Sequence, residues 1–294
     1  MSSSAEPELM RIAVCLKFVD RRPEADATGA VVLDERFAGV SPADQAALEW
    51  ALTLAHDLDV PADDVAAITY GPSAADRVMR DALACGAGRA LRIDGGTEST
   101  SACIAEAIAE ALALDRVGLV VCGDYSADRG SGSVPAFIAA HLGVAAALGL
   151  LHLAVHDEDL VALRRLDGGR RERLRVSLPA VVSVEGGTAR LRRASLSATI
   201  RAASAQIDVV TPSSKAELHS RGTTHPYRPR SRALAAPEHE DALSRIIELT
   251  GAGSAAAVAT SSTPIVLEPG AAADRILAAL AYWGYDLPGP SGAL

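Results

Sequence analysis

The stretch VGLVVCGDYSADRGSGSVP, residues 117–135, decides which fold the sequence predicts. It begins with a continuous apolar run that ends at Cys122, as in a parallel strand buried on both faces. Gly123 ends the run, and a loop of small residues leads to Pro135, which suits the first turn of a helix. A strand, such a loop and a helix N-terminus together present free backbone N–H groups and a positive dipole end. The stretch therefore predicts a phosphate site, and a plain βα turn is the alternative.

The loop departs from the common nucleotide fingerprints. Gly130 and Gly132 begin a G-x-G spacing, but Pro135 stands where a dinucleotide motif has its third glycine. The G-K-[ST] of a P-loop is missing as well. We therefore expect a nucleotide phosphate here, but neither NAD nor a triphosphate that is hydrolysed.

Length and composition narrow the class of protein. The 294 residues can hold one large domain or two modest ones with a substantial core. A net charge of −9 argues against a general nucleic-acid binder. The apolar runs stay well short of the ~20 residues of a membrane span, so direct membrane insertion is not expected. The polar residues 1–10 lack the regions of a signal peptide, and we expect them to form a disordered leader.

The cysteines indicate the cellular compartment of the protein. The four cysteines are Cys15, Cys85, Cys103 and Cys122. They form neither a C-x-x-C motif nor the spacing of a disulfide framework. Free, mostly buried thiols in a cytoplasmic protein are the simplest interpretation.

Apolar runs alternate with helical patterns along residues 11–145. Strands are expected at residues 11–19, 65–70, 90–93 and 117–122, with a short strand or hairpin within 20–39. Helices are expected to begin at Ser41, at Ser73, at Ser99 or Thr100, and at Val134. At Ser41, Pro42 fits the first turn and Asp44 fits the partner position of a capping box. The alternation predicts an α/β fold with a mostly parallel, doubly wound sheet, whose ligands lie at the carboxyl ends of the strands.

After Gly149 the pattern becomes antiparallel. Strand-like runs occupy residues 150–156, 160–166 and 174–184, and Asp167-Gly168-Gly169 between the last two is a hairpin signal. These strands should extend the sheet and return the chain to its edge. Residues 185–193 are expected to project as a loop, followed by a short helix at 195–205.

The C-terminal third has a different organisation. We expect the α/β domain at residues 11–210, a Pro-rich linker or extended arm at 211–240, and a helical segment at 241–294. That segment should contain helices at 241–249 and 271–283 and a short strand at 265–267. The second helix places apolar residues on one face: Ile276, Leu277, Leu280 and Trp283. Such an arm could pack on a partner or on its own domain, and the sequence leaves both open.

Catalytic and metal motifs are missing from the sequence. It has no G-x-S-x-G, no H-E-x-x-H and no other metal-ligand spacing. His152 and His156 are four residues apart in a strand-like run, where surface histidines are more common than ligands. A nucleotide pocket without catalytic side chains favours a binding or carrier protein over an enzyme.

Residues 162–183, ALRRLDGGRRERLRVSLPAVVS, resemble the signature region of electron transfer flavoprotein beta subunits. The matching features are a small residue, a basic residue, an acid with two glycines, a later Glu and an L-P-A-V-V run. They correspond here to Ala162, Arg164, Asp167-Gly168-Gly169, Glu172, Leu174 and residues 178–182. So many constraints at fixed spacing make this resemblance specific.

Three further segments resemble the same family. RIAVCLKFVD at residues 11–20 is similar to its first strand, with Lys17 in the usual place. SPADQAALEWA at residues 41–51 is similar to N-P-x-[DC]-x-x-A-[LV]-E-x-A. ADRGSGSVP at residues 127–135 is similar to a nucleotide loop of the form D-G-D-T-G-Q-V. The resemblance covers residues 11–207 and is much weaker beyond them.

The resemblance implies a fold, a complex and a role. Family members have an adenine-nucleotide-alpha-hydrolase-like fold and pair as heterodimers with an alpha subunit that holds FAD. The beta subunit buries an AMP in its own pocket and helps to hold the FAD. Electrons pass from donor dehydrogenases through this FAD to a membrane quinone reductase. By this resemblance the chain is an electron carrier subunit and not an enzyme by itself.

The resemblance also implies site residues. The nucleotide pocket would be lined by Cys15, Ser41, Pro42, Ala43, Asp44, Tyr70, Asp128, Arg129, Gly130, Ser131, Gly132, Ser133, Val134 and Pro135. The loop from Gly186 to Arg193 would recognise the donor dehydrogenases. From the residues themselves, we expect that a side chain at Gly132 would restrict φ and intrude on the phosphate, and that Arg129 is the second phosphate contact.

Several residues depart from the family pattern. Ser41 replaces Asn, and Arg129-Gly130 replaces Gly-Asp, which trades an acid for a base and suits a phosphate. Thr188 stands where a Leu anchors the donor, and Arg165 stands where many members carry Glu near the flavin. The departure at Thr188 suggests an unusual donor dehydrogenase, and the departure at Arg165 suggests different tuning of the flavin. A divergent actinobacterial member associated with mycofactocin is the expected case.

Two alternatives share the predicted fold. A stress-protein-like nucleotide-binding module would act as a homodimer without flavin, and the segment at residues 162–183 argues against it. An adenylating enzyme would carry S-G-G-x-D near the first strand, and this motif is missing.

Overall fold

The computed structural model of the chain describes residues 10–22, 24–25, 31–32, 34–96, 99–115, 117–157, 159–213, 236–237, 239, 241–250 and 266–283. The chain divides into two compact units, Met1–Tyr227 and Arg228–Leu294. Residues 1–9 of the expected leader and residues 214–235 of the expected linker lie outside the described residues.

The first unit is built on a sheet of nine described strands in the order β11-β10-β9-β12-β8-β1-β6-β7-β13. Their bounds are β1 Arg11–Cys15, β6 Val65–Gly71, β7 Arg89–Asp94, β8 Val117–Gly123, β9 Ala145–His156, β10 Asp159–Arg165, β11 Arg171–Ser177, β12 Ala180–Val184 and β13 Asp208–Val210. Neighbours from β9 to β13 pair in parallel, whereas β10 is antiparallel to both β9 and β11. The predicted α/β fold with a mostly parallel sheet and added antiparallel strands is confirmed.

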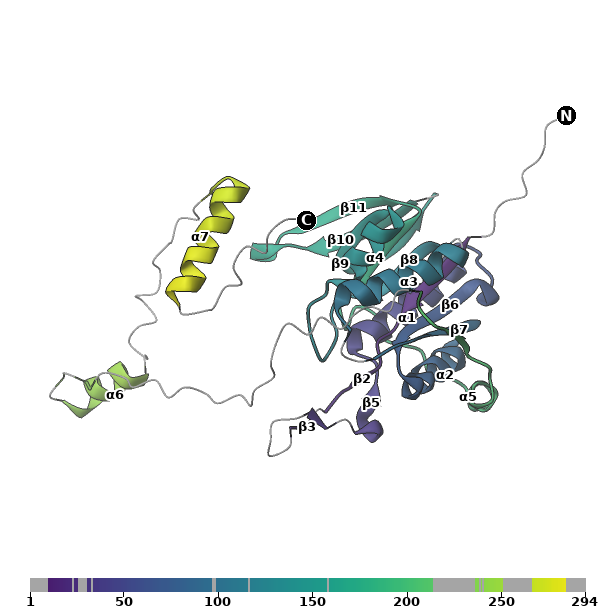
Figure 1. The fold of residues 1–294 in the computed structure, drawn as a ribbon, viewed down its shortest axis with the longest axis horizontal. Coiled ribbons are helices and arrows are strands. Elements are labelled where there is room, and N and C mark those ends of the chain that lie inside the picture. The colour runs from purple at the N-terminus through teal and green to yellow at the C-terminus, as the bar shows by residue number, and fades with distance from the viewer. Residues whose placement is uncertain are drawn as a thin grey trace. The chain divides into compact units, whose positions relative to one another are not determined.

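Helices cover both faces of this sheet (Figure 1). Helices α1 (Pro42–Asp57) and α2 (Asp76–Cys85) share one apolar core with the sheet, and α3 (Ser101–Asp115) and α4 (Val134–Leu142) share the other. Strand β8 contributes to both, because Leu119 and Val121 lie in the first core while Val120 and Cys122 lie in the second. The continuous apolar run is therefore buried on both faces, as predicted.

Two helix starts are where the sequence places them. Ser41 is the N-cap of α1, and its Oγ accepts a hydrogen bond from the backbone N–H of Asp44 at 3.1 Å. Thr100 directly precedes α3, and its Oγ1 accepts a hydrogen bond from Cys103 N in the first turn at 3.3 Å. The side chains thus satisfy backbone N–H groups that have no partner within the helix.

The helix start predicted at Ser73 is wrong. Ser73–Ala75 forms a short 3-10 turn, and α2 begins at Asp76 after Ala75. Ala75 N donates to Pro72 O at 2.9 Å, so this turn takes up the residues that were expected to form the first helical turn. Gly86 ends α2 at φ 122°, a conformation that favours glycine, and the predicted helix end is confirmed.

The predicted strand at residues 174–184 is two strands. Strand β11 ends at Ser177, a cis Leu178–Pro179 peptide follows, and β12 begins at Ala180. Proline lacks the N–H that a continuous ladder requires, so the chain leaves the edge here. It then inserts β12 between β9 and β8. The hairpin predicted at residues 167–169 does join β10 to β11, and its Gly168 has φ 69°.

Other strand bounds also differ from those predicted. Strand β9 begins at Ala145 instead of residue 150 and continues through Gly149. The run at residues 11–19 is interrupted, and β2 (Val19–Asp20) leaves the large sheet to pair with β5 (Ala38–Gly39). A small hairpin expected within residues 20–39 is present as β3 (Glu24–Ala25) and β4 (Val31–Val32). Helix α5 (Leu196–Ala203), also predicted, begins after its N-cap Ser195 and packs on α2.

The second unit contains helices α6 (Ala242–Thr250) and α7 (Pro269–Tyr282), close to the two predicted helices. The strand predicted at residues 265–267 is not formed at Val266 and Leu267, and residue 265 lies outside the described residues. Among the described residues, every helix is too short or too polar to cross a membrane.

Candidate functional site

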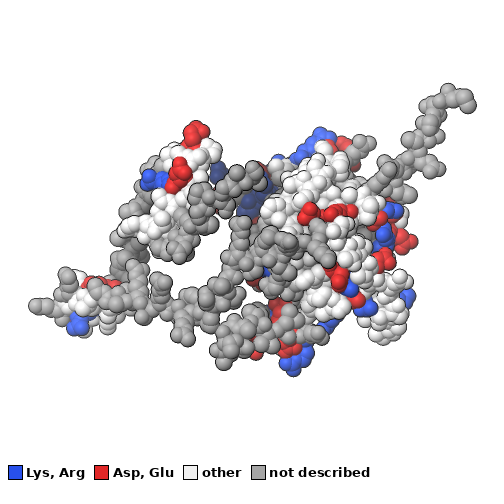
Figure 2. Space-filling view, viewed as in Figure 1, with Lys and Arg blue, Asp and Glu red and all other residues white. Residues whose placement is uncertain are grey.

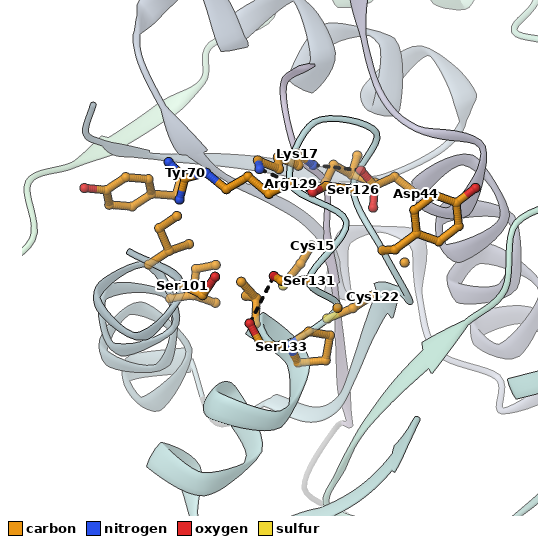
Figure 3. A pocket seen from close by; sticks show the side chains of 18 of the residues that line it. Cys15, Lys17, Asp44, Tyr70, Ser101, Cys122, Ser126, Arg129, Ser131 and Ser133 are labelled. Atoms are coloured by element: carbon orange, nitrogen blue, oxygen red, sulfur yellow. Dashed lines mark hydrogen bonds between the residues drawn. The ribbon is translucent and has the colours of Figure 1, made fainter. Parts of the chain in front are cut away.

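A pocket opens at the carboxyl ends of β1, β6 and β8, where parallel sheets of this kind bind ligands. It encloses about 100 Å³ between these strand ends, the first turns of α3 and α4, and the loop at residues 124–133. Figure 3 shows Lys17, Arg129 and Ser126 along one rim, with Ser131 and Ser133 on the opposite side. The stretch that decides the fold therefore also forms much of the pocket.

Most of the predicted site residues line this pocket. Those from the strands and α1 are Cys15, Asp44 and Tyr70, and those from the loop and α4 are Arg129, Ser131, Gly132, Ser133, Val134 and Pro135. The others do not line it: Ser41, Pro42, Ala43, Asp128 and Gly130.

Two of these outer residues hold parts of the lining in place. Ser41 Oγ donates a hydrogen bond to Tyr125 O at 3.4 Å, which joins the start of α1 to the loop. Asp128 turns to Lys17, whose Nζ lies 2.7 Å from both carboxylate oxygens. These residues therefore position the lining instead of forming it.

The pocket also contains residues outside the predicted set. Lys17 and Leu16 follow β1, Tyr125 and Ser126 follow β8, and the first turns of α3 add Ser101, Ile104 and Ile108. Further lining comes from Ile68, Cys122 and Gly123. Lys17 had a signal in the sequence, because the resemblance at residues 11–20 includes this lysine in its usual place. The α3 residues had none, since their helical spacing is that of ordinary core residues.

Lys17 and Asp128 set the charge at the rim. Lys17 Nζ also donates to Ser126 Oγ at 3.4 Å, and the two charged side chains are 32% and 39% exposed. Burial alone would raise the pKa of Asp128, but hydrogen bonds from Lys17 and Ser126 outweigh it and lower that pKa below its usual range. Asp128 is therefore ionised at neutral pH, and Lys17 is held over the pocket.

Asp44 is a buried acid in the pocket wall. Burial raises its pKa to about 7, although hydrogen bonds from the backbone of Lys17 and from Ser41 oppose this rise. Its Oδ2 accepts from Lys17 N at 3.1 Å. The space beside it is tight, because a Cβ at Gly123 would lie 2.5 Å from Asp44 Oδ1. Asp44 therefore changes charge near neutral pH inside the pocket.

Gly132 is required by the backbone conformation of the loop. Gly132 has φ 59°, and a Cβ there would lie 2.4 Å from Asp124 O. The predicted restriction of φ is confirmed, and a side chain would also meet the loop backbone itself. The predicted intrusion on a ligand stays a prediction. Arg129, predicted to contact a phosphate, donates from Nη1 to Ser99 O at 2.6 Å and so joins the loop to the segment before α3.

The comparison with protein families decides the class of the chain. Residues 29–215 match the family model described as electron transfer flavoprotein domain. The chain belongs to the electron transfer flavoprotein family. This match covers most of the first unit and none of the second, Arg228–Leu294.

Individual relatives agree with this electron transfer flavoprotein assignment. The chain is 28% identical over 172 residues to an electron transfer flavoprotein subunit beta of Methylophilus methylotrophus, covering 57% of this chain and 65% of that one. It is 23% identical over 193 residues to the subunit beta of Dictyostelium discoideum, covering 66% and 76%. It is 30% identical over 181 residues to protein FixA of Bradyrhizobium diazoefficiens, covering 57% and 60%. The match spans just under two thirds of the Methylophilus relative, and the predicted beta-subunit resemblance is confirmed.

The signature segment of this electron transfer flavoprotein chain forms the β10–β11 hairpin and β12. Arg164 pairs with Glu172 across the hairpin, and Arg165 pairs with Glu185 after β12. Arg171 and Arg173 are exposed on the edge strand β11. Figure 2 shows Lys and Arg side chains along the upper edge of this body, where Figure 1 places β11. The segment therefore combines a buried scaffold with a basic outer surface.

The loop at residues 186–193 is fastened to α1 instead of projecting freely. Thr188 Oγ1 accepts from Trp50 Nε1 at 3.2 Å and donates to Glu185 O at 2.8 Å. Arg192 forms a two-point ion pair with Glu49, with Nη2 2.8 Å from Oε1 and Nε 3.0 Å from Oε2. Leu191 packs against the core, which leaves Arg190 and Arg193 exposed to solvent. The exposed chemistry of the loop in this electron transfer flavoprotein chain is basic.

Proposed function

We propose that this chain is the beta subunit of a heterodimeric electron transfer flavoprotein, with a nucleotide, AMP, in the pocket described above. The observation that carries the proposal is the grouping of cations and N–H donors at the carboxyl ends of β1 and β8. Family membership supports the electron-transfer role. The chain would act as a carrier subunit and not as an enzyme.

The lining chemistry fits a phosphate. Lys17 and Arg129 supply positive charge, and Ser126, Ser131 and Ser133 supply hydroxyl groups. Among the described residues no side chain caps α4, so its first N–H groups and its dipole face the pocket at Val134. A phosphate bound there would bridge the two cations and the helix end.

Other lining residues fit a nucleoside. Ile68, Ile104 and Ile108 form an apolar surface, and Tyr70 adds an aromatic ring whose hydroxyl lies 2.8 Å from Ser99 Oγ. A flat base packs well against such a wall, while polar groups at its edge select among bases. The pocket thus offers charged groups and apolar surface together, as a mononucleotide requires.

The alpha subunit would dock on the antiparallel extension. Its outer face carries half-buried Val161 and Leu163, which stand opposite Arg175 and Arg173 on β11. Half-buried apolar residues beside exposed arginines are typical of protein interfaces. With the alpha subunit docked there, this chain would help to hold the FAD of the alpha subunit. When bound, that FAD supplies the one- and two-electron chemistry of the complex.

The remaining parts of the role concern the electron path. The donor dehydrogenases would dock at residues 186–193, through the exposed Arg190 and Arg193. A membrane quinone reductase would accept the electrons. We place the heterodimer in the cytoplasm, because the four cysteines are free thiols.

The experiment is co-expression with the alpha subunit, followed by chromatography of the nucleotides that heat denaturation releases. We expect a yellow heterodimer with one FAD and one AMP per pair. Arg129→Ala and Lys17→Ala should each weaken AMP binding about tenfold or more, because each loses a charged hydrogen-bond donor. Arg201→Ala, on the exposed surface of α5, is the matched control and should retain AMP.

Two results would contradict the proposal. If the wild-type heterodimer releases no adenine nucleotide, the pocket has another ligand and the nucleotide role is wrong. If the chain forms a stable homodimer that needs no alpha partner, the stress-protein-like module becomes the better interpretation.

A further inference from the structure

Cys15 and Cys122 stand side by side in the sheet. Cys15 is the last residue of β1, and Cys122 lies near the end of the neighbouring parallel strand β8. The strand register pairs these two residues directly. Adjacent strands lie about 4.7–4.9 Å apart, which falls within the Cα separation of about 4.4–6.8 Å that disulfides accept.

Both side chains point the same way and into the same space. Cys122 is buried in the core between the sheet and helices α3 and α4, and Cys15 packs against that core from β1. Both line the pocket, where Figure 3 labels them near Ser131. Paired residues on one face of a sheet have nearly parallel Cβ directions, so the two thiols are neighbours.

The two thiols also differ in accessibility, and the pKa of Cys122 is shifted. The Cys15 thiol, and then burial, raise the pKa of Cys122 well above its usual value. Cys122 therefore remains a protonated thiol at neutral pH. Cys15 is only partly buried and is the sulfur that a small molecule entering the pocket meets first.

The other two cysteines provide a contrast within the same chain. Cys85 Sγ donates to Arg192 O at 3.7 Å, and Cys103 Sγ accepts from Thr100 Oγ1 at 3.0 Å. Each is partly buried, and neither has a cysteine among the partners that the structure describes. Exposure therefore does not distinguish Cys15 from Cys85 and Cys103. Its position beside another cysteine, Cys122, does.

We propose that Cys15 and Cys122 form a redox modification site, at which hydrogen peroxide entering the pocket converts the two thiols into a disulfide. Cys15, as its thiolate, attacks one peroxide oxygen; the O–O bond breaks, and the leaving hydroxide takes a proton to become water. Cys15 is then a sulfenic acid. The Cys122 sulfur attacks the Cys15 sulfur, the S–S bond forms, and the second water leaves. Two electrons pass from the sulfur pair to one peroxide molecule.

The disulfide would change the pocket. An S–S bond of about 2.05 Å draws the two sulfurs together beneath the loop, at the floor of the space that residues 131–135 close. A ligand in the pocket would in turn cover Cys15. This consequence rests on the proposed nucleotide function, and it predicts that AMP slows the oxidation. The disulfide itself does not depend on that function.

The test uses the full chain, reduced, freed of reductant and then treated with hydrogen peroxide. Remaining thiols are alkylated in denaturant, and tryptic peptides are analysed by mass spectrometry. We expect residues 12–17 and 117–129 as one linked peptide, and the peptides with Cys85 (81–89) and Cys103 (93–116) as alkylated singles. Dithiothreitol should release the linked pair, and far-ultraviolet circular dichroism should stay unchanged.

Three serine variants complete the experiment. Cys15→Ser and Cys122→Ser should abolish the linked peptide, whereas Cys103→Ser, the matched control, should retain it. The proposal is overturned if the wild type yields only oxidised Cys15 without a link. It is equally overturned if Cys15 links to Cys85 or Cys103 as often as to Cys122, because that result indicates exchange in unfolded chains.

The disulfide and the nucleotide role are tested separately. The linked peptide is scored without added nucleotide, and AMP release is scored on reduced protein. A chain that forms the link but releases no AMP retains the modification site and loses the nucleotide proposal. A chain that releases AMP but forms no link gives the opposite result.

Discussion

Trp50 donates its indole Nε1–H to Thr188 Oγ1 at 3.2 Å, and this contact joins helix α1 to the loop at residues 186–193. Trp50 is only 9% exposed, so its N–H has little access to water. The same threonine hydroxyl donates to Glu185 O at 2.8 Å. One side chain thus satisfies a buried donor and closes the turn that opens the loop.

Thr188→Val should therefore destabilise the first unit. Valine has nearly the same shape but leaves the Trp50 N–H without an acceptor, which costs about 1–3 kcal/mol for a buried polar group. The free energy of unfolding in urea measures this. Thr199→Val, which removes an exposed hydroxyl bonded to Ser195 O, is the control and should change it much less. Equal losses in both variants would contradict the importance of the Trp50 contact.

The exposed charge of the same loop should control donor docking. Reversing Arg190 and Arg193 together to Glu should slow electron transfer from the donor dehydrogenase, because like charges reduce both steering and affinity. The flavin spectrum of the heterodimer should not change. Stopped-flow reduction by the donor, at two salt concentrations, checks this. Arg36→Glu, an exposed arginine outside the loop, should have little effect, and an equal effect there would contradict a specific docking site.

Asp44 should make stability depend on pH. Its pKa rises from 3.8 in the unfolded chain to about 7 in the folded protein, so the folded state holds the proton more tightly. The free energy of unfolding should then fall as pH rises between about 4 and 7, by up to about 4 kcal/mol at 1.36 kcal/mol per pKa unit. Above pH 7 this contribution should level off.

The measurement is urea unfolding across this pH range for the wild type and for Asp44→Asn. The amide has the shape of the acid but does not titrate, so the variant should lose most of the slope. Asp63→Asn, in an exposed turn, is the control and should keep it. If Asp44→Asn retains the full slope, another group is responsible.

The two loop glycines offer a matched pair of substitutions. Gly130 and Gly132 have φ 62° and 59°, so alanine at either position costs about 1–2 kcal/mol for the left-handed backbone. At Gly130 the nearest atom to the new Cβ is Ser126 O at 3.9 Å, whereas at Gly132 it is Asp124 O at 2.4 Å. Gly132→Ala should therefore lower the unfolding free energy clearly more than Gly130→Ala does. Equal losses would show that the loop relaxes around the added methyl group.

Much of the fold and part of the site followed from the sequence. The apolar run at residues 117–122 predicts a strand buried on both faces, and Ser41 and Pro42 predict the start of α1, because these signals act within a few residues. The glycines after Asp167 likewise predict the hairpin. The pocket loop at residues 124–133 was located for the same reason, since a strand, a small-residue loop and a helix start lie next to one another along the chain.

Tertiary structure alone decided where distant segments meet. Strand β9 passes through Gly149 because β12 and β10 pair with its two halves, and no local pattern encodes these partners. The α3 residues entered the pocket because the helix crosses it, and Thr188 turned inward because Trp50 lies beneath it. Local sequence determines which element a segment forms, since helix and strand signals are short-range. The contacts between elements depend on packing and pairing across the whole sheet, and these decided the pocket and the neighbouring thiols.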